Sequence, residues 1–570
     1  MGNYIIEDFS VKVLNISSAE RKYRRNLLIS TYIITKRKER KIISKRKISR
    51  RDFLKTAGAG AAAAGIAGMA GKDLLGQLFP PGVQAAKKPP PPERIPIDSA
   101  IIIGGGVAGL SAAMMLTDRN VCNTLTVIEQ CHRPGGRVQT SHYDNGQHGV
   151  AAFMESYDSD MDPETHWMWN ELGFGGPDIA KWGDNQFMWW RGQYVPQTGN
   201  WASFINDLPF DDEGGAAAFI ESEDVFWELE KCILEWPLDT AGCYPDYDYT
   251  DFEDWMLWVE HKKKGKMPNW RSDVAELWDI NLRSETGVEA WESSAAWGIL
   301  AACYWDLSNS YYILKDGMYA MIERLMQRIP AGSVKLNETV SSVTNISDTS
   351  VQVETNKGTY TADVAIVAVP HNKVAGIVPN LPSNKAASLA SMGNSKNFVA
   401  MQQYSERFWN TVYGFTDDSW GGYSDEGDYG NYPTNKPGSF SIGNETCFQT
   451  GTTGILTTYV NEPTATPLWD PANIKGVHAI GSLKTAVTDL VLDDMEAYWP
   501  RVREFLISGS EKVYCWDPYG PNFPVGHVAG GNYALNKEPV GRIYFVGDYI
   551  EDFGVGDAIL SSMDVTDKFE

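Results

Sequence analysis

The stretch that decides the fold is AIIIGGGVAG, residues 100–109. Its first four residues are apolar, as in a short buried strand, and residues 110–116 (LSAAMML) predict a helix. Between them, Gly104 permits a tight turn, Gly106 lets a pyrophosphate approach the backbone, and Gly109 lets the helix pack closely on the strand. The free N–H groups at the start of this helix would bind the phosphates. The order of strand, glycine turn and helix therefore predicts a dinucleotide site.

A second apolar run, residues 125–128, follows the helix and ends at Glu129. This acid comes twenty residues after Gly109, where a carboxylate can accept hydrogen bonds from ribose hydroxyls. A glycine pattern alone is weak evidence, but the strand, helix and acid together make it strong. A glycine-rich turn without a nucleotide is the alternative.

Residues 133–137 have the sequence RPGGR. Gly135 and Gly136 let the chain pass close to a cofactor, and the guanidinium of Arg137 can bind a pyrophosphate through two N–H groups. The sequence contains no second GxGxxG pattern, so a separate NAD site is not expected.

The spacing from Glu129 to Arg137 resembles that of the flavin-containing amine oxidase superfamily. This superfamily includes amine and polyamine oxidases, L-amino-acid oxidases and carotenoid desaturases. The resemblance implies FAD as the cofactor.

The C-terminal region resembles the end of the same cofactor domain. Residues 542–548 (RIYFVGD) predict a strand that ends in Gly-Asp, and residues 554–562 (GVGDAILSS) predict a glycine turn into a helix. By the resemblance, Asp548 binds the ribityl-phosphate region, and the helix start near Gly556 and Ala558 lies beside the pyrimidine edge of the flavin. An ordinary strand-loop-helix closure is the alternative.

The middle of the chain supplies a third piece. Apolar residues in 318–329 recur at helical spacing and indicate core packing rather than cofactor contacts. Residues 334–340 predict a strand, and residues 364–370 (VAIVAVP) resemble the end of the superfamily's meander. By the resemblance, the backbone of Val340 meets the adenine. The residues expected to bind FAD are Gly104, Gly106, Val107, Ala108, Gly109, Glu129, Gly135, Gly136, Arg137, Val340, Asp548, Gly556 and Ala558.

The fold class expected is α/β, with a Rossmann-like FAD-binding domain built from three chain segments and an inserted mixed α+β substrate domain. The FAD-binding segments are expected at residues 95–150, 313–375 and 535–570. The substrate domain is expected at residues 151–312 and 376–534. Residues 1–92 are expected to hold a basic leader, an export signal and a Pro-rich linker.

The export signal is centred on residues 49–55 (SRRDFLK), which precede an Ala/Gly-rich run at residues 56–71. This arrangement resembles a twin-arginine (Tat) signal. It implies the Tat translocase as a partner, cofactor loading before export, and a periplasmic or extracellular protein. The apolar patch at residues 27–35 is too short to span a bilayer, so no stable membrane anchor is expected. A chance Arg-Arg pair is the alternative, and whether residues 1–48 are translated is left open.

Charge is unevenly distributed over the 570 residues. Residues 1–100 hold 20 Lys and Arg against 8 Asp and Glu, whereas residues 101–570 hold 30 against 65. An acidic body argues against nucleic acid as a partner, since phosphate binding requires clustered cations. It is compatible with a small cationic amine as the substrate, although solubility alone explains it as well.

Cysteine and histidine patterns argue against a metal. The seven cysteines form no CxxC pair, and the eight histidines form no HxxxH or HExxH pattern. Neither a disulfide framework nor a protein-bound metal site is expected.

The expected substrate domain is rich in aromatic residues, because 15 of the 20 tryptophans lie between Trp167 and Trp305. They fit either an aromatic core or a ring-lined pocket for an ammonium group. By the resemblance, a lysine near flavin N5 lies on a strand that runs to a Phe-Trp pair, here residues 408–409. Lys396 is the catalytic candidate, although the spacing would place Val399 there. The aromatic residues facing the flavin could be Trp516, Tyr519 or Tyr533.

The function expected is that of an exported FAD-dependent oxidoreductase that oxidises an amine by hydride transfer to flavin N5. The alternatives are an FAD-dependent desaturase of an apolar, polyene-like substrate and a flavoprotein without turnover. The sequence leaves open the substrate, the electron acceptor, the FAD linkage and the oligomeric state.

Overall fold

The computed structural model of the protein describes most of the chain from residue 94 onward. The described residues are 94–153, 155–159, 162–181, 183–210, 214–234, 247–253, 255–256, 270–307, 311–414, 419–424, 440–444, 449–528, 530–551 and 554–570. All of them fall within one compact unit, residues 61–570. The expected leader, export signal and linker at residues 1–92 lie outside the described residues.

A five-stranded parallel sheet forms the first layer. Its strands, in spatial order, are β23 (Ile543–Phe545), β13 (Val364–Val367), β1 (Ser99–Ile103), β2 (Thr124–Ile128) and β9 (Val334–Lys335). Neighbouring strands therefore come from distant parts of the sequence. Every residue of β13 is buried, as expected for a parallel strand that is covered on both faces.

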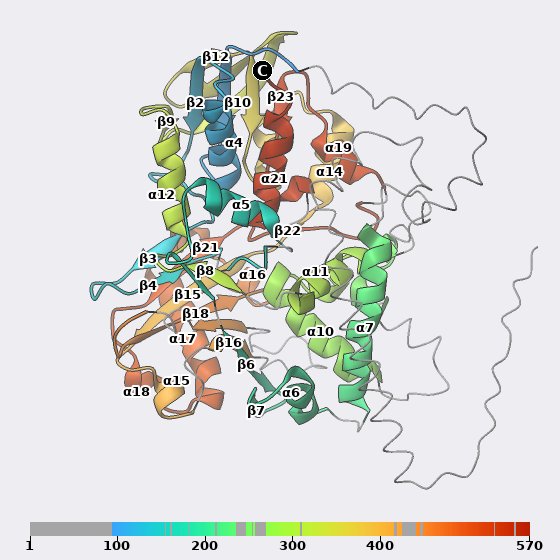
Figure 1. Ribbon diagram of the computed structural model, residues 1–570, viewed down its shortest axis with the longest axis vertical. Helices are drawn as coiled ribbons and strands as arrows, with labels where there is room; N and C mark the ends of the chain where they lie inside the picture. The colour runs from blue at the N-terminus through green and yellow to red at the C-terminus, as the bar shows by residue number, and fades with distance from the viewer. Residues whose placement is uncertain are drawn as a thin grey trace, which may run out of the picture. The chain divides into compact units, whose positions relative to one another are not determined.

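Helices and a smaller sheet pack on this layer. Figure 1 shows three helices side by side: α12 (Tyr319–Arg328), α4 (Val107–Asp118) and α21 (Val555–Thr566). The smaller, antiparallel sheet contains β10 (Val340–Ser347), β11 (Ser350–Thr355) and β12 (Thr359–Ala362), and it contacts β1 and β13. The protein therefore has an α/β fold with a parallel sheet, as the sequence predicts. The domain boundaries stay a prediction.

A second, nine-stranded sheet is mostly antiparallel. Its order is β19 (Ile474–Lys475), β20 (His478–Ala479), β21 (Lys512–Trp516), β15 (Asn397–Tyr404), β18 (Gly454–Val460), β17 (Phe440–Asn444), β16 (Ser419–Ser424), β6 (Gly183–Trp190) and β7 (Gln193–Pro196). The elements that pack on it include helix α17 (Gly481–Tyr498) and the hairpin of β3 (Thr140–His142) and β4 (His148–Val150). Strands β15 and β18 are buried along their whole length.

Side chains along β15 alternate between the two faces of this sheet. Phe398 and Ala400 pack in one apolar cluster with α17, and we call this side the α17 face. Val399 and Met401 point the other way, and Met401 approaches Gly149 of the β3–β4 hairpin. We call this second side the hairpin face. This is the side of the sheet that contacts the β3–β4 hairpin.

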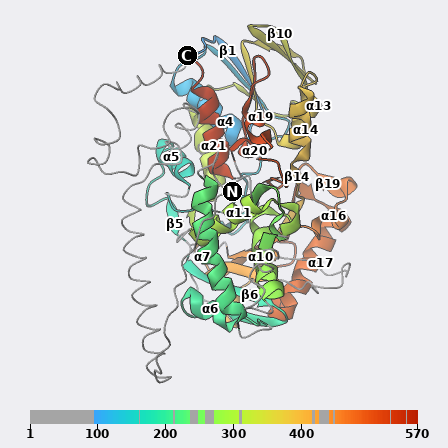
Figure 2. The same ribbon diagram turned by 90° about the vertical axis from the view of Figure 1, so that its right-hand side faces the viewer.

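A group of helices forms a further layer (Figure 2). It contains α7 (Gly215–Leu234), α10 (Trp270–Thr286) and α11 (Ala295–Leu307), which pack on one another. The ring of Trp278 stacks on Phe219 at 4.8 Å between centroids, and its Nε1 donates to Ser222 Oγ at 2.7 Å. These aromatic residues are core, which was one of the two alternatives for the tryptophan-rich region.

Residues 334–340 do not form the single strand expected from the sequence. They contain β9 and the first residue of β10, separated by Asn337 with a φ of 52°. The backbone N–H groups of Asn337 and Glu338 donate to the carbonyl oxygens of Cys131 and Glu129, both at 3.0 Å. The left-handed residue breaks the strand and turns the chain toward Glu129.

The helix expected at residues 318–329 is α12. Its residues Met321, Ile322 and Leu325 are buried, as predicted for core positions. Within the part of the chain that the structure describes, no helix is long and apolar enough to cross a membrane.

Candidate functional site

The glycine turn between β1 and α4 contains two positions that only glycine fits. Gly104 has a φ of 107°, and a Cβ on it would lie 2.6 Å from the carbonyl oxygen of Ala368. A Cβ on Gly109 would clash with the carbonyl oxygen of Gly104. Gly106 differs, because a Cβ there would meet no protein atom within 4 Å. The turn therefore leaves space beside Gly106, where the sequence predicts a pyrophosphate.

Helix α4 starts directly after Gly106, and no side chain caps its first turn. The first turn also contains no acidic residue. Backbone N–H groups at a helix start carry a partial positive charge. The start of α4, at Val107 and Ala108, is therefore suited to an anionic ligand.

Glu129 holds two neighbouring loops together. Its Oε2 accepts a hydrogen bond from Gly105 N at 2.7 Å, and its Oε1 accepts one from Cys131 N at 2.7 Å. Burial, aided by this carboxylate, raises the pKa of the Cys131 thiol to about 11. The thiol is therefore neutral at physiological pH.

The glycine pair after Cys131 also approaches this turn. Gly135 N donates to Gly105 O at 2.7 Å, and the two glycines have positive φ values of 105° and 54°. A Cβ on Gly135 would lie 2.9 Å from Val138 O. Gly135 and Gly136 thus bring a second stretch of backbone against the dinucleotide turn.

Arg137 joins three distant parts of the chain. Its Nη1 lies 2.7 Å from Asp548 Oδ2 and donates to Tyr519 O at 2.7 Å. Tyr519 N in turn donates to Ser395 O at 2.9 Å, just before β15. The structure therefore brings two predicted cofactor residues, Arg137 and Asp548, into direct contact and connects them to the nine-stranded sheet.

The C-terminal helix α21 lies beside α4. Ser562 Oγ donates to Ala108 O at 2.8 Å, which ties the two helices together. Helix α21 begins after Gly554, whose φ is 112°, and no side chain caps it. Helices α4 and α21 therefore pack together, and neither has a side-chain cap at its first turn.

Gly556 and Ala558 lie in the first turn of α21. A Cβ on Gly556 would clash with Asp162 Oδ1, the N-cap residue of helix α5 (Pro163–Glu171). Ala558 is buried. The structure thus gives Gly556 a packing role, and the predicted contact of both residues with the flavin stays a prediction.

Val340 is the first residue of β10, and it is partly buried. The chain reaches it from Glu338, whose N–H donates to Glu129 O. This places the segment before Val340 beside the predicted ribose ligand. Its contact with adenine stays a prediction.

The hairpin face contacts the segment that follows β4. Trp516 Nε1 donates to Ala151 O at 2.7 Å, and the Tyr459 hydroxyl donates to Ala152 O at 2.9 Å. Of the three aromatic candidates, Trp516 and Tyr519 therefore lie at this junction. Tyr533 instead donates through its hydroxyl to Glu551 O. Sequence reasoning did not single out Tyr459, because its partner is 307 residues away.

Lys396 is directed toward the α17 face. Its Nζ lies 5.7 Å from the ring centroid of Trp469, and that ring lies 5.2 Å from Phe398. Asn397 has the opposite parity and shares the hairpin face with Val399. The catalytic role of Lys396 stays a prediction, and this geometry weighs against it. The alternation of side chains along the strand was the signal that could have placed Asn397, rather than Lys396, on the hairpin face.

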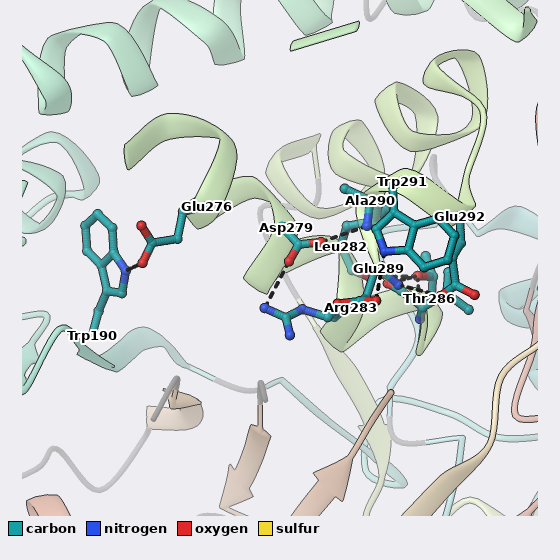
Figure 3. A network of polar contacts seen from close by, with 11 residues as sticks. Trp190, Glu276, Asp279, Leu282, Arg283, Thr286, Glu289, Ala290, Trp291 and Glu292 are labelled. Carbon is teal, nitrogen blue, oxygen red and sulfur yellow. Dashed lines mark hydrogen bonds and ion pairs between the residues drawn. The ribbon is translucent and has the colours of Figure 1, made fainter. Parts of the chain in front are cut away.

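A polar network fixes the turn after α10 (Figure 3). Asp279 binds Arg283 Nη2 at 2.9 Å and accepts from Ala290 N at 2.7 Å. The turn rests on the start of β15, because a Cβ on Gly287 would lie 3.1 Å from Ser395 Oγ. The network therefore holds the helical layer against the strand that carries Asn397.

Buried acids elsewhere on α10 are paired with a cation. Glu276 accepts from Trp190 Nε1 at 2.7 Å, and Arg191 Nη2 lies 2.5 Å from both Glu276 and Asp273. These carboxylates are charge-compensated, so their role is to connect β6 to α10. No group of three or more His, Cys, Asp or Glu suited to a metal occurs among the described residues.

Comparison with known families agrees with this geometry. A sequence model described as "Flavin containing amine oxidoreductase" matches residues 107–567. The chain belongs to the flavin-containing amine oxidoreductase family. A second model, of the twin-arginine translocation pathway signal sequence, matches residues 47–67. The chain therefore carries a Tat signal sequence, as the sequence analysis predicts.

Two curated relatives are similar to this chain. Polyamine oxidase 4 of Oryza sativa subsp. japonica is 26% identical over 334 residues, which are 55% of this chain and 60% of the relative. Pseudooxynicotine dehydrogenase of Pseudomonas sp is 25% identical over 383 residues, which are 63% of this chain and 70% of the relative. The match thus spans about 60% of the length of the rice protein.

Solved structures support the fold. A structure of putrescine oxidase bound to putrescine has a TM-score of 0.62 at 17% identity, and the match covers 83% of this chain and 98% of that one. At this identity the likeness concerns the fold alone.

The residues around the glycine turn fit an FAD. The space beside Gly106 and the uncapped start of α4 suit a pyrophosphate. Arg137 adds a cation, and Glu129 adds a buried carboxylate next to the turn. A dinucleotide requires this combination of donors, cation and acceptor.

Three buried histidines of the chain are neutral at physiological pH. Burial lowers the pKa of His148, His371 and His527 to about 4 in each case. His371 also has Asp548 and Arg137 nearby, with opposing effects on its pKa. None of the three therefore carries a proton to donate from a positively charged imidazolium at pH 7.

These pKa values make stability depend on pH. Because the unfolded state binds more protons between pH 6.5 and 4, stability falls as the pH falls through this window. We expect each histidine to lower the free energy of unfolding by about 2 kcal/mol when the pH falls from 7 to 5. Urea unfolding of wild type and His527→Asn at the two pH values measures this. The variant should lose about 2 kcal/mol less than wild type, and equal losses would contradict the assignment.

Proposed function

We propose that this protein is an exported FAD-dependent oxidoreductase that oxidises an amine by hydride transfer to flavin N5. The observation that carries the proposal is the contact of Arg137 with Asp548 and Tyr519, which joins the dinucleotide turn to the hairpin face. Family membership and the names of the two relatives support an amine substrate.

The proposed FAD-binding domain comprises residues 95–150, 313–375 and 535–570, and the proposed substrate domain comprises residues 151–312 and 376–534. The start of α4 would bind the pyrophosphate, with Arg137 as the cation. Glu129 would accept from the ribose hydroxyls, and Val340 would meet the adenine. Asp548, Gly556 and Ala558 would lie along the ribityl chain and the flavin.

When bound, FAD supplies an electron acceptor for the hydride from the C–H bond next to the substrate nitrogen. The protein would orient this bond and exclude water. Trp516 and Tyr459 would contribute apolar surface at the hairpin face, where both are buried. Lys396 is retained only as a candidate catalytic residue, since its Nζ lies beside Trp469.

The Tat signal sequence supports passage through the Tat translocase, with a periplasmic or extracellular destination. We propose that FAD is loaded before export. The acidic body of the chain is compatible with a small cationic amine arriving from solution.

The test of this function is an anaerobic titration of the purified, FAD-loaded protein with a panel of amines, followed by visible absorption. Bleaching of the flavin bands by an amine would support the proposal. Flavin that stays oxidised with every amine but is bleached by an apolar polyene would favour a desaturase. A protein that cannot be loaded with FAD would overturn the proposal.

The pH dependence of the reaction should follow the substrate. Only the neutral amine can release hydride, and the buried histidines titrate near pH 4. We expect the apparent affinity in flavin reduction to improve about tenfold per pH unit up to the pKa of the amine. The pH at which the affinity stops improving should shift from one amine to another by the difference between their pKa values. A break at one fixed pH would indicate an enzyme group instead.

A further inference from the structure

Two fully buried asparagines on the hairpin face bind each other. Asn397 Nδ2 donates to Asn461 Oδ1 at 2.6 Å, and both residues are 0% exposed. Asn397 Oδ1 and Asn461 Nδ2 have no hydrogen-bond partner in the described part of the chain. If both amides are turned over, the roles exchange, but the pair still keeps one free acceptor and one free donor.

The register of the sheet places this pair. Asn397 lies opposite Trp516 in the β15–β21 pairing, and residues opposite each other point to the same face. Asn461 follows β18 and has the same parity as Tyr459. Trp516 and Tyr459 bind the carbonyl oxygens of residues 151 and 152. The pair is therefore adjacent to the residues that bind the segment directly after β4, at the border of the proposed FAD-binding domain.

The start of β15 adds another free polar group. Ser395 Oγ is buried and also has no hydrogen-bond partner among the described residues. Ser395 O accepts from Tyr519 N, and Tyr519 O binds Arg137. A chain of contacts thus leads from Arg137, the predicted pyrophosphate ligand, to Ser395, two residues before Asn397.

Unpaired buried amides are costly. Most buried polar groups in proteins have a partner, and leaving one unpaired costs about 1–3 kcal/mol. Apolar residues at these two strand positions would avoid that cost. The hairpin face, unlike the α17 face, adjoins the β3–β4 hairpin of the proposed FAD-binding domain, so a bound substrate there can satisfy the free acceptor and donor.

We propose that the Asn397–Asn461 pair is the polar binding element for the substrate and selects a neutral primary or secondary amine. The free amide oxygen accepts an N–H of the amine, and the free amide N–H donates to a second polar group of the substrate. A neutral tertiary amine has no N–H and lacks this contact. The inference rests on the proposed amine oxidation.

Gln402 supplies a matched control on the same strand. It is 0% exposed, and both its amide atoms lack a partner among the described residues. Its parity places it on the α17 face with Ala400. Substitution of Gln402 therefore removes a buried amide from β15 without changing the hairpin face.

The experiment compares FAD-loaded wild type with Asn397→Leu, Asn461→Leu and Gln402→Met. The first readout is binding of tert-butylamine, which has no C–H next to nitrogen and is not oxidised, detected by perturbation of the oxidised flavin spectrum. We expect its Kd to rise about tenfold in both asparagine variants and to stay within about twofold in Gln402→Met. Asn397→Thr repeats the test if the leucine variant does not fold.

The second readout is anaerobic reduction by a primary amine. The asparagine variants should show the same loss of affinity, a nearly unchanged limiting rate and a reduced preference over the matching tertiary amine. The inference would be overturned if both asparagine variants bound the amine as tightly as the wild type, or if Gln402→Met lost as much affinity as they do. Amine oxidation itself would still be supported in that case, provided that the amine reduces the flavin of the wild type. If no amine reduced the wild type, the proposed function and this inference would both fail.

Discussion

Replacement of Gly106 by valine yields a folded protein with less than about a tenth of the wild-type flavin. Gly106 has a φ of −77° and a ψ of −178°, an extended conformation that valine adopts readily. A Cβ there meets no protein atom within 4 Å, so the apoprotein tolerates it. The added side chain would occupy the space proposed for the pyrophosphate.

The measurement is the ratio of flavin to protein absorbance after incubation with excess FAD, together with thermal unfolding of the apoprotein. Gly109→Ala is the contrasting variant, because its Cβ would clash with Gly104 O. It should lower the stability of the apoprotein itself. Wild-type flavin content in Gly106→Val would show that the cofactor does not pass beside this turn.

Arg137→Met should also lose flavin, and it should destabilise the apoprotein by about 1–3 kcal/mol. The Asp548 side chain is only 9% exposed, so removal of Arg137 leaves a nearly buried carboxylate without the cation at 2.7 Å. The bond from Arg137 to Tyr519 O is lost as well. Urea unfolding of apoprotein and flavin content are the two measurements.

A double variant separates these two effects. Arg137→Met with Asp548→Asn removes both charges, so most of the lost stability should return. Flavin binding should not return, because the cation proposed for the pyrophosphate is still missing. A double variant that binds FAD like the wild type would mean that Arg137 acts on stability alone.

The dinucleotide turn could be predicted because its constraints are local. The clash that requires glycine at 109 involves Gly104, five residues earlier in the same turn. The α/β fold follows from similar short patterns of buried strands and helices. These patterns depend on neighbouring residues and need no knowledge of the rest of the chain.

The aromatic junction could not be resolved in the same way. The choice among Trp516, Tyr519 and Tyr533 depends on partners 365 and 382 residues away, which no local pattern encodes. The break at Asn337 depends on its backbone conformation. For Lys396, the family spacing falls on Val399, three residues later, and an odd shift exchanges the two faces of a sheet, so the catalytic role of Lys396 stays a prediction.

The order in which the parallel sheet is completed has a consequence for biosynthesis. Strand β23 and helix α21 follow every other element of the first layer in chain order, and Ile95 binds the backbone of Lys568 and Glu570. A ribosome that has reached residue 500 has made the glycine turn but not Asp548. The proposed contact of FAD with Asp548 therefore becomes possible only after this last segment has been made, and a premature stop before residue 548 would leave the proposed site without Asp548 and without α21.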